Sequence, residues 1–175
     1  MKLVVGLGNP GEEYEHTRHN AGRIVAGLAE KKLERLKIKF ITPDTFMNNS
    51  GKAITLFVKT KKDLANLIVV YDDIDLPLGK IKISFNKSSG GHNGLDSIIK
   101  ALKSREFTRI RVGISPATSK GIVKKPKGEK AVLNFLLGEF KKSELEILKK
   151  LGKIVAEAIE TIFSESREKA MSLYN

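Results

Sequence analysis

Apolar residues along this chain follow either the continuous or alternating pattern of β-strands or the roughly 3.6-residue spacing of α-helices. Lys2–Leu7 is an apolar run and predicts a first strand, and the β-branched run Leu67–Tyr71 predicts a central one. Polar and apolar residues alternate in Lys80–Phe85, as in an edge or antiparallel strand. The remaining candidates are strands at 38–41 and 109–114, helices at 21–29, 53–57, 95–102, 132–137 and 143–163, and a short helix after the last of these.

This alternation predicts an α/β fold, a three-layer sandwich in which helices flank a mixed, mainly parallel sheet. A chain of 175 residues with 41% hydrophobic content can bury one core, so we expect residues 1–175 to form a single domain. No apolar run approaches the ~20 residues that cross a bilayer. The chain begins with a strand-like segment rather than a signal peptide. We therefore expect a cytoplasmic protein without a membrane partner.

Basic residues outnumber acidic ones, 32 to 20, giving a net charge of +12 that suits a polyanionic partner such as nucleic acid. Lysine-rich surfaces also serve solubility, so charge alone leaves both interpretations open. The positive charge is densest in the Gly- and Pro-containing segment 115–130, at Lys120, Lys124, Lys125, Lys127 and Lys130. The absence of cysteine excludes disulfides, thiolate catalysis and cysteine-ligated zinc.

Asparagines stand beside glycine or turn-forming residues in three short segments, Gly6–Gly11, Thr45–Gly51 and Gly90–Gly94. The asparagine amide offers a donor and an acceptor and stays neutral, so converging asparagines suit an uncharged amide or ester. They cannot transfer protons. A titratable partner must come from the histidines or from the acidic cluster Asp72–Asp75.

The first of these segments also matches a dinucleotide-binding pattern, with glycines at 6, 8 and 11 after a strand. That pattern requires a helix at its last glycine and an acidic residue ~20 positions later at the end of a second strand. Here Gly11 is followed by Glu12-Glu13-Tyr14-Glu15, a poor cradle for phosphate, and Glu30 falls within the first expected helix. Nucleotide binding is therefore disfavoured.

A divalent ion held by Asp72, Asp73 and Asp75 with His16 and His19 is a second alternative. Acidic clusters at strand ends often cap the next turn, and Asp75–Gly79 predicts such a turn after the strand. No HExxH-like ligand spacing is present, so we expect no metal. The other chemistry needs one histidine and one carboxylate. Asp72 would fix the tautomer of a neutral imidazole, which takes a proton from water as that water attacks a carbonyl.

Six co-linear motifs spanning most of the chain resemble those of the bacterial-type peptidyl-tRNA hydrolase family. They are Gly6–Gly11, Thr17–Gly22, Thr45–Asn48, Asp72–Pro77, Gly90–Leu95 and Arg109–Ile114. The resemblance implies a cofactor-free esterase that cleaves the ester between a peptide and the tRNA ribose and so recycles tRNA. A substrate this large on one open face is compatible with a monomer. The resemblance also implies that His19 is the general base, that Asp72 holds its basic form, and that Asn9 distinguishes N-blocked from free aminoacyl esters.

By the same resemblance, the substrate and its tRNA are bound by Tyr14, Phe46, Met47, Asn48, Gly91, Asn93 and Arg111. Asn93 would also hold the attacking water, and Met47 would supply an apolar wall. An aromatic residue can instead pack in the core, and we expect this role more for Phe46 than for Tyr14. A pure RNA-binding module is disfavoured, because it would need neither His19 nor Asp72.

The chain departs from the family in three places. Only 28 residues lie between His19 and Asn48, so a segment is missing there and we expect a smaller sheet. A basic position associated with phosphate binding aligns with Ser84, leaving Lys82 or Lys87 to substitute. The lysine-rich segment 115–130 aligns poorly, and our hypothesis is that it forms a mobile lid over the acceptor stem.

Overall fold

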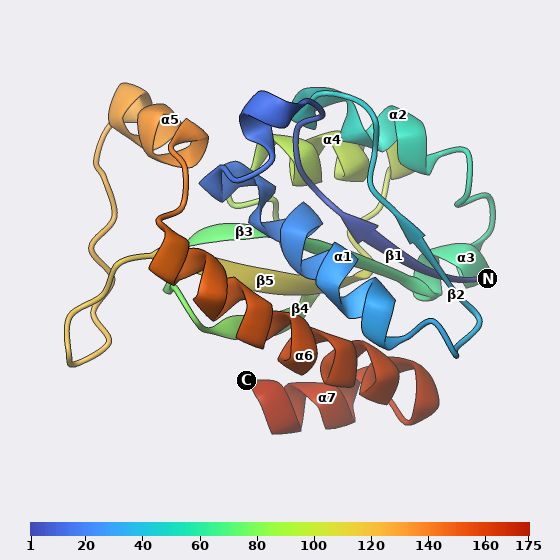
Figure 1. Cartoon of the computed structure of the whole chain (residues 1–175). Coiled ribbons are helices and arrows are strands. Elements are labelled where there is room, and N and C mark those ends of the chain that lie inside the picture. The colour runs from blue at the N-terminus through green and yellow to red at the C-terminus, as the bar shows by residue number, and fades with distance from the viewer.

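The computed structural model describes residues 1–175 and contains one five-stranded sheet of order β2-β1-β3-β5-β4 (Figure 1). The four strands β2, β1, β3 and β5 run parallel, and β4 is antiparallel at one edge. The strands are β1 (Lys2–Gly6), β2 (Ile38–Ile41), β3 (Leu67–Pro77), β4 (Ile81–Phe85) and β5 (Thr108–Ser115). The central strand is thus the β-branched run, and the alternating segment is the antiparallel edge.

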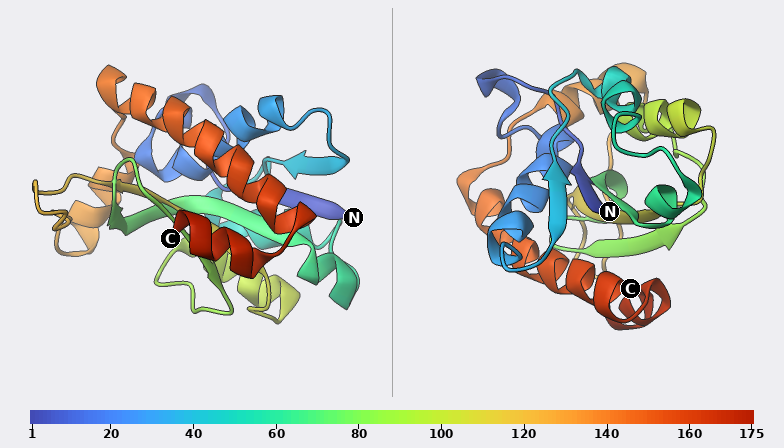
Figure 2. Two further views of the ribbon diagram at one scale, coloured as in Figure 1. Left: turned by 90° about the horizontal axis from the view of Figure 1, so that it is seen from below. Right: turned by 90° about the vertical axis from the view of Figure 1, so that its right-hand side faces the viewer.

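Helices cover both faces of this sheet (Figure 2). On one face lie α1 (Ala21–Lys32), α6 (Lys142–Ser164) and α7 (Arg167–Tyr174), and on the other lie α2 (Ser50–Ile54), α3 (Lys61–Ala65) and α4 (Asn93–Leu102). The remaining helix, α5 (Glu129–Leu137), stands apart at one end of the sheet (Figure 1). None of these helices combines the length and the apolar character needed to span a bilayer. The predicted three-layer α/β fold with a mixed, mainly parallel sheet is confirmed.

Two apolar clusters fill the space between the sheet and its helices. Successive residues of a strand point to opposite faces, so Ile68 and Val70 of β3 join the cluster under α1 and α6, while Leu67 and Val69 join the cluster under α2 and α4. Because both faces are covered, β3 is apolar at every position from Leu67 to Tyr71. This double burial fixes the strand that carries the acidic cluster.

The structure changes the expected end of the central strand. The sequence predicts a turn over Asp75–Gly79, but β3 continues through Pro77 and only Leu78 and Gly79 turn. The register with β5 shifts between Asp73 and Pro77, and the Ser115 hydroxyl donates to the Ile74 carbonyl at 2.6 Å. Pairing with β5 therefore outweighs the local turn preference of the Leu-Pro-Leu-Gly sequence.

One short helix was missed by hydrophobic spacing. The sequence predicts no element at 61–65, where α3 forms. Its signal is a capping box, in which the Thr60 hydroxyl accepts from Asp63 N at 3.1 Å and the Asp63 carboxylate accepts from Thr60 N at 3.0 Å. A cap of this kind starts a helix without a long apolar face.

Candidate active site

A buried histidine and a buried aspartate meet at one end of the sheet. His19 lies in a 3₁₀ turn, Arg18–Asn20, that leads into α1, and Asp72 lies in β3. The exposed fractions of these residues are 6% and 3%. His19 Nδ1 lies 2.9 Å from Asp72 Oδ2, so Nδ1 carries the proton that the carboxylate accepts. The unprotonated nitrogen of a neutral His19 is then Nε2, which is free to accept a proton.

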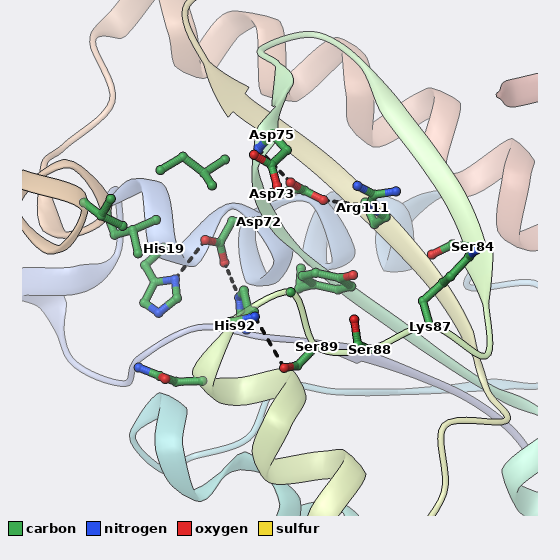
Figure 3. A pocket seen from close by; sticks show the side chains of 17 residues that line it. His19, Asp72, Asp73, Asp75, Ser84, Lys87, Ser88, Ser89, His92 and Arg111 are labelled. Atoms are coloured by element: carbon green, nitrogen blue, oxygen red, sulfur yellow. Dashed lines mark hydrogen bonds and ion pairs between the residues drawn. The ribbon is translucent and has the colours of Figure 1, made fainter. Parts of the chain in front are cut away.

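A second histidine holds the other oxygen of the same carboxylate. His92 Nε2 lies 2.8 Å from Asp72 Oδ1 (Figure 3). His92 is the N-cap of α4, and its Nδ1 accepts from the Leu95 backbone N–H at 3.2 Å. Since Nδ1 accepts, the proton of His92 lies on Nε2 and points at Asp72. The turn before it uses Gly90 and Gly91, whose φ angles of 60° and 82° favour glycine.

The charges of this cluster stabilise one another. Burial opposes ionisation of Asp72, yet His19 and His92 together hold the pKa of its carboxyl well below the usual range. For His19, burial favours the neutral ring, but the Asp72 carboxylate outweighs it and raises the pKa above 6.5. The carboxylate therefore stabilises the imidazolium that forms when His19 accepts a proton.

The cluster is a poor metal site as it stands. His19, Asp72 and His92 are the one group of metal-ligand type, with the ligand atoms within 4.8 Å of one another. His92 Nδ1, however, accepts the hydrogen bond from Leu95 N–H, so the proton of the neutral ring lies on Nε2. A protonated Nε2 has no lone pair to offer a metal ion. The wider set considered from sequence is not assembled.

The remaining members of that wider set have other partners. Asp73 accepts from Arg111 Nε at 2.6 Å, and Asp75 is paired with Lys125 Nζ. The third, His16, is exposed on the surface. These aspartates therefore serve as ion-pair partners of basic side chains at the rim of the site.

Asn9 is fixed by bonds on two sides. Its backbone N–H donates to Asn20 Oδ1 at 2.8 Å, and its carbonyl accepts from Asn20 Nδ2 at 2.9 Å. Its side-chain Oδ1 accepts from Met47 N at 2.8 Å. Because a backbone N–H needs an acceptor, the oxygen must face Met47, and the Nδ2 group of Asn9 is left as a free donor.

The three asparagine-bearing turns lie together. Asn9 bonds to Met47, the residue before Asn48, and a Cβ at Gly94 would collide with the Met47 sulfur. Met47 is 5% exposed and packs below the turns, while Asn48 and Asn93 are exposed. Residues far apart in the chain are thereby brought to one end of the sheet.

Two aromatic side chains flank these turns. The ring centroids of Tyr14 and Phe46 lie 6.2 Å apart in an edge-on arrangement. The expectation that Phe46 is the likelier core residue is wrong, because 55% of it is exposed and Tyr14 is half-buried. Phe46 therefore offers an apolar face to solvent beside Asn48.

The glycine-rich first segment does not form a phosphate cradle. Gly11 has a φ of 106° and leads into a three-residue 3₁₀ turn, Glu12–Tyr14, rather than a helix. The first helix starts only at Ala21. This geometry agrees with the sequence argument against a dinucleotide site and makes the segment a support for Asn9.

A pocket of about 320 Å³ opens beside the cluster (Figure 3). Its lining includes His19, Asp72, Gly91, Asn93 and Arg111, with Val132 and Leu136 of α5 on one side. Asn9, Tyr14, Phe46, Met47 and Asn48 lie outside this lining. The predicted site residues thus fall into two groups, one within the pocket and one at the asparagine turns next to it.

The strand-edge end of the pocket is basic. Lys82 of β4 is in register with Arg111 of β5, and Lys87 and Ser84 line the pocket with Arg111. The Ser84 hydroxyl is buried without a hydrogen-bond partner. Lys82 and Lys87, the two candidates named from sequence, therefore both lie close to Arg111.

A buried arginine that the sequence did not single out lies under the loop before His92. Arg109 has no exposed surface, and its guanidinium donates to the Ser88 carbonyl at 2.8 Å and to the Lys87 carbonyl. It thereby holds the loop that leads to Gly91 and His92. Alternation in β5 places Arg109 on the face opposite Ile110, Val112 and Ile114, so the sequence pattern gave no signal that this arginine is buried.

Comparison with known proteins decides the family. The model of the peptidyl-tRNA hydrolase family matches residues 3–175. The chain belongs to this family. It is 43% identical over 188 residues to the peptidyl-tRNA hydrolase of Thermotoga maritima, covering 99% of this chain and 96% of that protein. It is 41% identical over 194 residues to the peptidyl-tRNA hydrolase of a Thermoanaerobacter species, covering all of both chains.

A solved structure of the same family has the same fold. The crystal structure of peptidyl-tRNA hydrolase from Acinetobacter baumannii superimposes with a TM-score of 0.85 at 25% sequence identity, covering 100% of this chain and 94% of that one. Membership of the peptidyl-tRNA hydrolase family makes this chain an enzyme that acts on the ester bond of peptidyl-tRNA. The resemblance inferred from the six motifs is confirmed.

Proposed function

We propose that this peptidyl-tRNA hydrolase uses His19 as the general base and Asp72 as the residue that holds His19 in its basic form. The supporting observation is the bond from His19 Nδ1 to Asp72 Oδ2, which leaves Nε2 free to accept a proton next to the neutral asparagine turns. His19 Nε2 takes a proton from water while the water oxygen bonds to the ester carbonyl carbon. The imidazolium then returns that proton to the ribose oxygen as the carbon–oxygen bond breaks.

His92 keeps Asp72 in place during these steps. Both carboxylate oxygens accept a hydrogen bond from a histidine, so the carboxylate cannot rotate without losing one of them. The negative charge that develops on the carbonyl oxygen needs donors that do not disturb the charge of His19. Exposed amides at Asn48 and Asn93 meet that need, and Asn93, which lines the pocket, binds the attacking water.

Asn9 selects for substrates whose α-amino group is blocked. Its free Nδ2 donates to a carbonyl oxygen, which an N-acyl group supplies and a free amino acid lacks. A free α-ammonium carries only donors, so it would face Nδ2 without an acceptor. The Phe46 and Tyr14 rings offer surfaces for a terminal base or a peptide group, and the buried Met47 supplies an apolar wall.

The basic end of the pocket binds the tRNA backbone. Gly91, Lys87 and Arg111 line the same pocket as His19, Lys82 pairs in register with Arg111, and a net charge of +12 favours a polyanion. Segment 115–130 would act as a lid, because Lys125 pairs with Asp75 at the rim and the segment's other lysines are exposed. We further propose that the enzyme acts as a monomer in the cytoplasm, where its large substrate is found, without cofactor or metal.

Release of tRNA from N-acetyl-aminoacyl-tRNA tests this proposal. Wild type, His19→Ala and Asp72→Asn are compared, each with and without a metal chelator. We expect cleavage by wild type in both conditions, and retained tRNA binding with cleavage slowed by about 10³-fold in His19→Ala. An unchanged rate for His19→Ala would exclude His19 as the base, and loss of wild-type activity in chelator would restore the metal alternative.

A further inference from the structure

Arg18 directly precedes the proposed base, and no step of the proposed mechanism uses it. Its side chain is 16% exposed and points at the last turn of α5 rather than into solvent. The Nε atom is buried without a hydrogen-bond partner. Burying part of a guanidinium costs free energy of folding, so the contacts of its other nitrogen atoms must offset that cost.

The guanidinium of Arg18 binds the C-terminal end of α5. Its Nη1 donates to the Phe135 carbonyl at 3.3 Å, and its Cζ lies 4.5 Å from the centroid of the Phe135 ring. The Nη2 atom lies 3.8 Å from the carboxylate of Glu144 at the start of α6. A cation is favoured at a helix C-terminus, where carbonyl groups lack intrahelical donors. Arg18 thus bridges the end of one helix and the start of the next.

The backbone repeats this connection. Arg18 N donates to the Gly138 carbonyl at 3.0 Å, and Phe140 N donates to the His16 carbonyl at 2.9 Å. Thr17 forms a bridge with Glu139 between these two bonds. The chain that leaves α5 is therefore paired with the chain that enters the turn bearing His19.

Helix α5 is held mainly at its C-terminal end, where the partly buried Phe135 and Leu136 pack against the apolar cluster under α1 and α6. None of its residues is buried, and Leu133 and Leu137 are 52% and 41% exposed. Yet Val132 and Leu136 line the pocket together with His19. The position of Val132 and Leu136 relative to His19 therefore depends on contacts at one end of a nine-residue helix.

We propose that Arg18 is a positioning residue that seats α5 on the turn bearing His19, so that Val132 and Leu136 keep a fixed place beside the base. This inference rests on the proposed hydrolysis at His19. Arg18 acts through the helix, not on the reacting atoms. Its loss should therefore weaken substrate binding while the titration of His19 is unchanged.

The test compares Arg18→Gln and Arg18→Lys with Arg35→Gln, a control that removes a surface ion pair to Glu160. With N-acetyl-aminoacyl-tRNA, Arg18→Gln should raise KM roughly tenfold and leave the pH midpoint of kcat in place. Arg18→Lys should show a smaller rise, because lysine keeps the charge but not the planar stacking and fork geometry. Arg35→Gln should match wild type.

Hydrogen exchange provides a readout that needs no substrate. In Arg18→Gln the amides of 129–137 should exchange faster, while those of the sheet keep their protection. A second variant leaves Arg18 itself intact. In Gly138→Ala the new Cβ would lie 2.5 Å from Arg18 Nη1 and displace the guanidinium. The matched control is Gly27→Ala, whose new Cβ would have no atom within 4 Å. Gly138→Ala should reproduce the KM effect and the faster exchange.

Each outcome decides the proposal. Unchanged KM and unchanged exchange in Arg18→Gln would overturn it, as would a lower kcat with a shifted pH midpoint, since Arg18 would then act on His19 directly. If Arg18→Gln does not fold, Gly138→Ala decides in its place. If wild type cleaves no peptidyl-tRNA, the proposed function fails, and hydrogen exchange alone decides whether Arg18 seats α5.

Discussion

The cluster around Asp72 and the part of the chain from 116 to 137, which reaches the same pocket through Val132 and Leu136, are built in opposite ways. His19 and Asp72 are buried and joined by hydrogen bonds to fixed partners. The segment 116–128 and α5 contain no buried residue and are held by one ion pair to Asp75, by the contacts at Arg18 and by the packing of Phe135 and Leu136 against the core. Electrostatic interactions are strongest where water is excluded, which suits proton transfer.

The contrast separates chemistry from substrate capture. Proton transfer requires atoms placed to within a fraction of an ångström. The Asp72 carboxylate, held by hydrogen bonds from His19 and His92, supplies that precision. A polyanion as large as tRNA must approach and leave, which exposed lysines permit because their charge acts through solvent. Substitutions in the cluster should therefore change kcat, and substitutions in the segment should change binding.

Removing the base should have the largest effect. We expect His19→Ala to lower kcat by about 10³-fold, because no other group near the ester can accept the proton from water. The matched control is His16→Ala, since His16 is exposed and outside the pocket. Rates of tRNA release under single-turnover conditions measure both. Comparable losses in the two variants would contradict the assignment of His19.

Asp72→Asn should cost nearly as much, about 10²-fold in kcat, for a reason specific to this cluster. An amide has one acceptor oxygen, whereas His19 and His92 both donate to Asp72. The bond from Leu95 keeps the proton of His92 on Nε2, so the amide oxygen must serve His92. The amide NH₂ would then face His19 Nδ1 and move the proton of His19 to Nε2, where it blocks the base.

A double variant sharpens this prediction. In a His92→Ala background, the amide introduced by Asp72→Asn can turn its oxygen to His19. Asp72→Asn should therefore lower kcat less in that background than in wild type. Rates of the four enzymes form a double-mutant cycle. Additive losses would show that the two histidines do not compete for Asp72.

The pH dependence should identify the group that titrates. His19 acts as a base only when neutral, so kcat should rise with pH through its pKa, which the Asp72 charge raises above 6.5. Replacing that charge in Asp72→Asn leaves only the effect of burial, which lowers the pKa, so the midpoint of the residual activity should move to lower pH. A midpoint that moves upward would argue against the ion pair.

Asn9→Asp should change selectivity more than rate. Aspartate keeps an acceptor for Met47 N but replaces the free Nδ2 donor with a second acceptor. We expect roughly tenfold lower kcat/KM for N-acetyl-aminoacyl-tRNA and a smaller loss for free aminoacyl-tRNA, whose ammonium the carboxylate attracts. Equal losses for both substrates would remove Asn9 from the selection step.

The smallest effect on kcat should come from the basic segment. Changing Lys124, Lys125 and Lys127 to alanine should weaken tRNA binding and lower its salt dependence by about 0.7–0.9 units of slope for each phosphate that is no longer neutralised. Triple replacement of Lys59, Lys61 and Lys62, which lie beside and in α3, removes equal charge and serves as the control. If binding and its salt slope stay unaltered in the first variant, the lid hypothesis fails.

Much of the fold could be predicted because its signals are local. The apolar runs of β1 and β3 and the helical spacing of α4 and α6 reflect burial on one or both faces, which hydrophobic periodicity records directly. The elements that escaped prediction depend on polar contacts. Helix α3 starts at a capping box, and the extension of β3 to Pro77 depends on pairing with β5.

The candidate site divides in the same way. By itself, the sequence determined which residue types are present in which order, and these were sufficient to indicate the family, the histidine and the carboxylate. Only the tertiary structure decided that His92 shares Asp72 with His19, that Asn9 presents Nδ2, and that Phe46 is exposed. Those features arise from contacts between residues 20 to 53 positions apart, as from His92 or His19 to Asp72 and from Asn9 to Met47, and no local pattern encodes such distances.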